Sequence, residues 1–366
     1  MRRAIGAGQP VVVKIGSSSL TASGGLIDHA AIERVVAQIA DLHRSGHPPV
    51  LVSSGAVAAG LPALGVTQRP DDLPGLQAAA AVGQGKLIER YAQAFTHHDL
   101  VVGQVLLTRD VLAGREPHLH ARAALDRLLS LGVVPIVNEN DTVAVDELRF
   151  GDNDRLAAIV SHLVGAGLLV ILTDTPGIYA DDPRLVAEPE LLNAVRHSDE
   201  ILDALRDSGR AGDYGSGGVA TKIAAARMAA FSGIPTVVTA ADDPDAVLRA
   251  TKGEDVGTWV EPRTVSLGAR KLWIAFSLPV EGTLVIDQGA VTALVEKGRS
   301  LLAAGVTAVE GEFDRGDAVE IRDVSGRLIG KGLAGLGASV LNGVLGRHTS
   351  VAGGAAVHRD DLIILV

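Results

Sequence analysis

The sequence contains no cysteine, and aromatic residues make up only 3% of its 366 positions. The lack of cysteine excludes disulfides, thiolate nucleophiles and thiolate zinc sites. No apolar run is long enough to cross a membrane, because polar residues and glycines divide the longest one, Leu156–Leu172, into a helix, a turn and a strand. Gln9, Pro10 and Lys14 interrupt the apolar core that a signal peptide near the amino terminus would need. We therefore expect no membrane association and a cytoplasmic protein.

The length favours about two domains, and the residue pattern changes near residue 273. Before Pro262, apolar strands alternate with helical patterns. After it, short β-like runs punctuated by glycine and aspartate occur at Thr283–Ile286, Val306–Val309 and Ala318–Arg322. The sequence thus predicts an α/β domain over residues 1–262, a linker over 263–272 and a small β-rich domain over 273–366.

Two clusters of acids and amides follow one another in the middle of the chain. The apolar run Val133–Val137 predicts a buried parallel strand that delivers Asn138-Glu139-Asn140-Asp141 at its carboxyl end. Gly151-Asp152-Asn153-Asp154 then opens a helix with apolar residues at helical spacing. Asp and Asn at turns and caps are often only local backbone hydrogen-bonders. Small ligands, however, bind at the carboxyl ends of strands in open α/β sheets, so both clusters are candidates for one crevice.

Lys14 is unusual because it lies inside the apolar strand Val11–Ile15. A lysine within an apolar strand is rare unless it contacts an anion. We therefore favour contact with an anion over a lysine whose ammonium group extends into solvent. The following Gly16-Ser17-Ser18 turn can direct backbone amides toward phosphate oxygens, although such turns are common. After a second strand, Ser53-Ser54-Gly55-Ala56 begins a helix, which suits either a bound anion or a simple serine cap.

A third group of polar residues suits a nucleotide. Thr173-Asp174 follows the strand Leu168–Leu172, and a glycine-rich loop at 213–218 opens a helix that carries Thr221 and Lys222. A glycine-rich loop, a hydroxyl and a lysine at a helix start form a plausible triphosphate clamp, with a flexible surface loop as the alternative. Gly85-Lys86 fails the full phosphate-loop pattern, and no dinucleotide fingerprint or zinc-protease motif occurs.

Taken in order, these motifs resemble those of the glutamate 5-kinases in the amino-acid kinase family, over essentially the whole chain. The tail, with Gly311-Glu312-Phe313 and Gly316-Asp317-Ala318-Val319, is more loosely similar to a PUA domain. The resemblance implies an amino-acid kinase fold, a mostly parallel open sheet sandwiched by helices, with a small β-rich PUA-like domain. It also implies ATP with Mg²⁺, L-glutamate as phosphoryl acceptor, proline as feedback inhibitor and a homo-oligomer.

By position, the resemblance assigns roles to individual residues. Catalysis would involve Lys14, Lys222 and the orienting Asp154. Glutamate would be bound by Ser54, Gly55, Asn138, Asp141 and Asn153. The nucleotide would be bound by Lys14, Gly16, Ser17, Thr173, Asp174, Ser216, Gly217, Gly218, Val219, Ala220, Thr221 and Lys222. No metal ligands are assigned.

Two other functions stay open at this stage. Another amino-acid kinase, acting on acetylglutamate, aspartate, carbamate or a nucleotide, would keep the lysine and the nucleotide loop but change the acid and amide clusters. Alternatively, the tail could bind RNA on a kinase-like scaffold. The formal net charge of −10 argues against nucleic acid. Residues 270–366 also hold ten Lys and Arg against eleven Asp and Glu, whereas RNA-binding domains are strongly basic.

Overall fold

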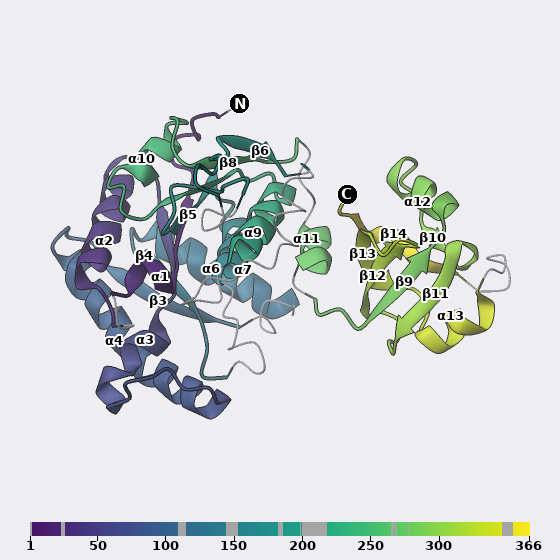
Figure 1. Cartoon of the computed structure of the whole chain (residues 1–366), viewed down its shortest axis with the longest axis horizontal. Coiled ribbons are helices and arrows are strands. Elements are labelled where there is room, and N and C mark those ends of the chain that lie inside the picture. Colours follow the sequence, from purple (N-terminus) through teal and green to yellow (C-terminus); the bar gives the residue numbers. More distant parts are fainter. Residues whose placement is uncertain are drawn as a thin grey trace. The chain divides into compact units, whose positions relative to one another are not determined.

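The computed structural model describes residues 2–22, 26–108, 115–143, 153–181, 186–197, 199, 218–264, 267, 269–276, 278–345 and 354–366. The chain divides into two compact units, Met1–Ser266 and Leu267–Val366, each with its own sheet (Figure 1). The range 263–272, predicted as a linker, includes the start of helix α11 (Ala269–Phe276). Ile274 and Ala275 of this helix pack against Ile363, so α11 is part of the second unit.

The first unit contains an eight-stranded sheet in the order β3-β4-β2-β1-β5-β7-β8-β6. All neighbouring strands are parallel except β7 and β8, which confirms the predicted open, mostly parallel sheet. Its strands are β1 (Val11–Ile15), β2 (Pro49–Ser53), β3 (Val102–Leu107), β4 (Val134–Glu139), β5 (Leu168–Thr173), β6 (Ala194–Arg196), β7 (Thr236–Ala240) and β8 (Thr258–Glu261). Because β1, β2, β4 and β5 run in one direction, their carboxyl ends share one edge.

Helices cover both faces of this sheet (Figure 1). One face packs against α2 (His29–Arg44), α4 (Leu73–Thr96) and α10 (Ala246–Thr251). The other carries α6 (Arg115–Ser130), α7 (Asn153–Leu163) and α9 (Val219–Phe231). Three short elements, α1 (Ser17–Leu20), α3 (Ala56–Gly60) and the 3₁₀ turn η1 (Pro62–Leu64), follow β1 and β2. The polar turn predicted after β1 is thus one turn of helix.

Strand β1 shows how the sequence places Lys14 at the site. Side chains alternate between the two faces of a strand. Val11, Val13 and Ile15 belong to the core beneath α2 and α4. Val12 and Lys14 therefore face the opposite side, toward α7 and α9.

The second unit is built on a six-stranded sheet in the order β10-β14-β13-β12-β9-β11, with only β9 and β12 parallel. Its strands are β9 (Gly282–Ile286), β10 (Leu301–Leu302), β11 (Val306–Gly311), β12 (Ala318–Asp323), β13 (Leu328–Ala334) and β14 (Ala355–Ile364). Helices α12 (Gln288–Val295) and α13 (Ala338–Val344) and the 3₁₀ turn η3 (Ala303–Gly305) complete it. The predicted β-rich tail is confirmed. None of the helices that the structure describes is long and apolar enough to span a bilayer.

Candidate active site

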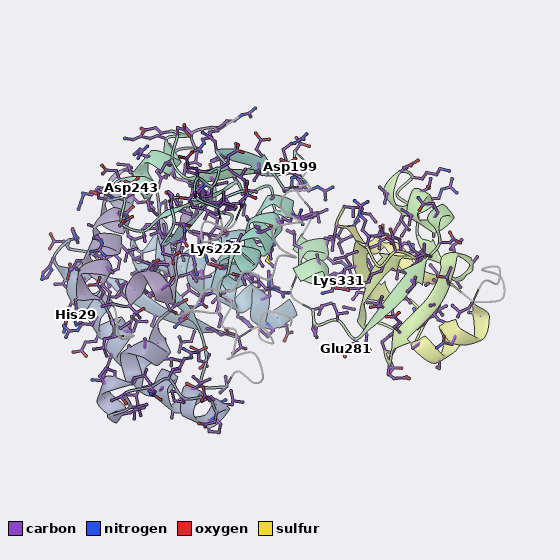
Figure 2. All side chains as sticks on the ribbon, in the orientation of Figure 1. His29, Asp199, Lys222, Asp243, Glu281 and Lys331 are labelled. Carbon is purple, nitrogen blue, oxygen red and sulfur yellow. The ribbon has the colours of Figure 1, made fainter. Side chains whose placement is uncertain are left out.

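The centre of the site is the buried carboxylate of Asp154, in the first turn of α7. Lys14 Nζ lies 2.6 Å from Asp154 Oδ1, and Lys222 Nζ lies 3.8 Å from Asp154 Oδ2. Lys222 belongs to α9 and is labelled in Figure 2. One acid therefore brings together two lysines that are more than 200 positions apart in the sequence.

The surroundings of Asp154 keep it ionised. Burial alone would raise the pKa of its carboxyl, but the charges of Lys14 and Lys222, with hydrogen bonds from Lys14 and Thr221, hold that pKa below its usual value. The Thr221 hydroxyl lies 2.7 Å from Asp154 Oδ2 and 2.9 Å from the carbonyl oxygen of Gly218. Asp154 thus acts as a fixed negative charge that orients both lysines and links α7 to the start of α9.

Small residues surround the lysines on the side predicted for the nucleotide. A Cβ atom on Gly16 would lie 3.2 Å from Lys14 Nζ, so the Gly16 backbone passes close to the ammonium group. Ser17 begins α1 directly afterwards. Gly218 is the N-cap of α9, and Val219, Ala220, Thr221 and Lys222 form its first turn. The N–H groups at a helix start, before the first intrahelical hydrogen bond from Lys222 N–H to the Gly218 carbonyl oxygen, favour a bound anion.

Thr173 and Asp174 lie at the end of β5, the strand next to β1. Thr173 is buried, and its hydroxyl donates a hydrogen bond of 3.0 Å to Asp174 Oδ1. Asp174 is exposed. A solvated carboxylate here can accept hydrogen bonds from a ribose or a base without the cost of burying a charge. Ser216 and Gly217 lie outside the described residues.

On the other side of Asp154, amides from β4 and α7 form one hydrogen-bonded cluster. Asn153 Nδ2 donates to Asn138 Oδ1 at 2.9 Å, to Ser54 Oγ at 2.8 Å and to the Ser53 carbonyl oxygen at 3.1 Å. Because Ser54 Oγ accepts, its own hydrogen is left for a ligand. Gly55 follows with φ 103° and caps α3, a conformation that L-residues adopt rarely.

The oxygen of the Asn153 amide has no partner among the described residues. Asn153 Oδ1 is buried, and only 7% of the surface of Asn153 is exposed. A buried acceptor without a donor is unfavourable by about 1–3 kcal/mol. A ligand with N–H groups would remove this cost, so Asn153 Oδ1 is a candidate acceptor for a donor such as an ammonium group.

Asp141 lies in the turn after β4, and the pKa of its carboxyl is raised to near neutrality. Burial, together with the nearby charge of Glu139, raises the pKa of Asp141 to about 7, while the charge of Arg69 opposes this rise. A cationic ligand beside Asp141 would favour its ionised form. Asp141, Asn138 and Asn153 thus offer acceptor atoms after β4 and at the start of α7, the helix whose Asp154 holds the lysines.

Several residues of this site were not predicted from the sequence. Gln84 accepts a hydrogen bond of 2.7 Å from Asn138 Nδ2, and the Tyr91 hydroxyl lies 2.8 Å from Ser53 Oγ. Arg69 acts on Asp141 through its charge. Gln84 and Tyr91 follow no motif on α4, and their spacing is that of ordinary helix residues. Only the tertiary structure reveals their contacts.

The residues present suit a magnesium ion carried by a nucleotide better than one held by the protein alone. No group of three or more His, Asp or Glu side chains gathers as a metal cage in the part of the chain that the structure describes. Both oxygens of Asp154 already face lysines. Mg²⁺ commonly keeps several waters and binds through phosphates and one or two carboxylates.

Comparison with known proteins agrees with this geometry. Residues 9–240 match the model of the amino acid kinase family, and residues 282–351 match the PUA domain. A carbamate kinase from Giardia lamblia, solved with AMP-PNP bound, has the same fold over 70% of this chain and 99% of its own, with a TM-score of 0.52 and 18% identity.

Relatives named glutamate 5-kinase match along the whole chain. The protein from Frankia casuarinae is 49% identical over 97% of this chain and 96% of its own. Those from Streptomyces avermitilis and Marinomonas sp. are 46% and 45% identical over 100% of this chain, and over 98% and 100% of their own. The chain belongs to the glutamate 5-kinases of the amino acid kinase family, with a carboxyl-terminal PUA domain.

Proposed function

We propose that the protein transfers the γ-phosphoryl group of ATP to the side-chain carboxylate of L-glutamate, which yields L-glutamyl 5-phosphate for proline biosynthesis. The observation that carries this proposal is the junction at Asn153-Asp154. Asn153 belongs to the amide cluster, whereas Asp154 holds the two lysines. This adjacency supports a glutamate site directly beside a phosphoryl-transfer centre.

The reaction requires charge stabilisation more than proton transfer. A side-chain carboxylate oxygen of glutamate attacks the γ-phosphorus, the bond to the β–γ bridging oxygen breaks, and ADP leaves. Negative charge spreads over the phosphoryl oxygens in the transition state. Lys14 and Lys222 are placed to stabilise that charge, and Asp154 fixes their positions. An ionised carboxylate needs no general base.

Binding of glutamate draws on the acceptor-rich side of the site. Asp141 and Asn153 Oδ1 serve the substrate ammonium, since one is a carboxylate and the other a buried acceptor without a donor. Asn138 orients Asn153 through its hydrogen bond. The Ser54 hydroxyl and the backbone at Gly55 can donate to a carboxylate of the substrate.

Binding of ATP uses the opposite side. Gly16 and Ser17 follow directly after the strand that carries Lys14, and Gly16 lies close to its ammonium group. Thr173 and Asp174 lie at the end of the adjacent strand β5. The segment from Ser216 to Lys222 completes the nucleotide site in this proposal, although Ser216 and Gly217 are outside the described residues. Mg²⁺ would enter with the phosphates and neutralise part of their charge.

Regulation by proline and assembly into a homo-oligomer are further parts of the proposal. Proline shares the α-carboxylate and a cationic nitrogen with glutamate, so Asp141 and Asn153 can serve both ligands. Competition between proline and glutamate in a titration, and the native mass in solution, test these two statements.

The activity itself is tested by ADP release in the presence of ATP, Mg²⁺ and L-glutamate. We expect release only when all three are present, and an acyl phosphate product that hydroxylamine traps. Parallel reactions contain acetylglutamate, aspartate or carbamate in place of glutamate. Equal turnover with any of these acceptors would contradict the assignment. Salt-sensitive retention on RNA without glutamate-dependent turnover would favour the RNA-binding alternative.

A further inference from the structure

Gln84, in the middle of α4, contacts the amide cluster although it belongs to none of the sequence motifs. Its Oε1 accepts a hydrogen bond of 2.7 Å from Asn138 Nδ2. The helix itself starts at Leu73, where the Asp72 side chain caps it by accepting from the N–H of Gly75. Gln84 therefore reaches the amide cluster from a helix that carries none of the residues assigned to glutamate from the sequence.

Two glycines allow α4 to come this close. A Cβ atom on Gly83 would lie 1.8 Å from the carbonyl oxygen of Ala56, and one on Gly60 would lie 2.0 Å from that of Ala79. Helices α3 and α4 thus touch through their backbones; both are labelled in Figure 1. Since α3 begins directly after Ser54 and Gly55, this contact holds Gln84 beside the amide cluster.

The direction of each amide in the cluster follows from its neighbours. Asn138 Oδ1 accepts from Asn153 Nδ2 and from the backbone N–H of Glu139, both at 2.9 Å. Asn138 Nδ2 must then find an acceptor, because Asn138 is only 1% exposed and a buried N–H group is costly without one. Gln84 Oε1 is that acceptor.

The fixed amide of Asn138 in turn determines which way Asn153 faces. If the Asn153 amide were reversed, its oxygen would face Asn138 Oδ1 and the carbonyl oxygen of Ser53, which are both acceptors. Its Nδ2 must therefore point into the cluster. Asn153 Oδ1 is left as the buried acceptor without a partner among the described residues.

We propose that Gln84 is a positioning residue for glutamate: it holds the Asn138 amide, and through it keeps Asn153 Oδ1 available for the substrate ammonium. This inference rests on the proposed function. Gln84 acts at a distance, through Asn138, and it has no role in ATP binding. Its removal should weaken glutamate binding selectively.

The test measures glutamate affinity by calorimetry and KM and kcat for both substrates. Gln84→Met keeps the length of the side chain but removes the acceptor, and we expect a roughly tenfold weaker affinity for glutamate. KM for ATP should stay within twofold. Gln93→Met is the matched control, because Gln93 is exposed on the same helix and bonds only to Glu89 and Arg90 in the described residues. It should behave as the unaltered protein.

Two further variants separate positioning from general packing. Gln84→Glu keeps an acceptor for Asn138 Nδ2, so it should recover most of the affinity that Gln84→Met loses. It also tests the inference independently if Gln84→Met fails to fold. In an Asn138→Ala background, Gln84→Met should cause no further loss, because its route to Asn153 is already broken.

The inference is overturned by normal glutamate affinity in soluble Gln84→Met, by equal weakening of ATP binding, or by losses that add to those of Asn138→Ala. A Gln84→Glu protein as impaired as Gln84→Met would overturn it as well. Failure of the proposed function would appear elsewhere, as the absence of glutamate-dependent ADP release by the unaltered protein.

Discussion

Lys14 Nζ and Asp154 Oδ1 form a 2.6 Å ion pair between side chains that are only 4% and 1% exposed. The pair connects the central strand β1 to the first turn of α7. Lys14 depends on Asp154 most, because a buried ammonium group without its carboxylate is costly, whereas Asp154 would keep Lys222 as a second counter-ion. Catalysis and stability are therefore coupled at this contact.

Loss of Asp154 alone should destabilise the first unit more than loss of both partners. We expect Asp154→Leu to lower the free energy of unfolding by about 3–5 kcal/mol, because it leaves Lys14 buried without its carboxylate, and Lys14→Met to lower it by less, because Lys222 still pairs with Asp154. The double variant should lose less than the sum and less than the worse single variant. Equilibrium urea unfolding measures all three. Additive losses would show that the two charges are not energetically coupled.

Lys222 offers a cleaner test of catalysis because it is more exposed than Lys14, at 13%. Lys222→Met should lower kcat by roughly 10² or more, since the lost charge is needed in the transition state. The folded protein should persist. Lys86→Met, at an exposed position of α4, is the control and should leave kcat unchanged. A normal kcat in soluble Lys222→Met would remove Lys222 from the reaction.

Glutamate affinity should rise with pH through the pKa of Asp141. Burial and Glu139 raise this pKa to about 7, so below that pH the free protein holds a neutral carboxyl that attracts an ammonium group poorly. Binding of the cation must then release a proton. We expect the dissociation constant for glutamate to fall roughly tenfold from pH 6 to pH 8. Titration calorimetry at several pH values, with buffers of different ionisation enthalpy, measures both the affinity and the proton release.

Asp141→Asn is the control for this pH dependence. The variant should bind glutamate more weakly, by roughly 1.5–3 kcal/mol, and should lose the slope between pH 6 and pH 8. KM for ATP should change by no more than a few-fold. A selective loss of ATP affinity, or an unchanged slope, would show that Asp141 does not face the substrate ammonium.

A chain ending at Thr264 should keep glutamate-dependent phosphoryl transfer. Every residue with a proposed role lies between Lys14 and Lys222, and this end point keeps the Arg263 guanidinium 4.6 Å from the centre of the Phe231 ring. It also removes α11 together with the second unit to which it packs. Turnover, native mass and proline titration of the shortened protein are compared with those of the full chain. A folded but inactive product would place part of the active site in the PUA domain.

The local pattern of the sequence predicted much of the site's framework. The strand Val11–Ile15 and the helix that begins near Asn153 occur where apolar spacing indicated. Helix α6 was not predicted, and it contains many charged and polar residues in place of an apolar stripe. Helix α10 was also not predicted, because its six residues are too few to show a helical periodicity of apolar residues.

The contacts within the site could not be predicted in the same way. Lys14, Asp154 and Lys222 meet only because three distant elements pack together, and no local spacing encodes that distance. Gln84 could not be distinguished from any other polar helix residue until Asn138 was placed beside it. The raised pKa of Asp141 likewise depends on burial, which a turn sequence does not reveal.

Strand β1 pairs with β2 on one side and with β5 on the other. During synthesis on a ribosome, residues 168–172 follow residues 11–15 after roughly 8–30 s at ~5–20 residues per second. For that interval β1 has an open edge of four apolar residues, and Lys14 is the single charge within it. A lysine in an exposed edge discourages pairing with other nascent chains. Lys14, which we propose stabilises phosphate charge, should thus also disfavour aggregation of the nascent chain.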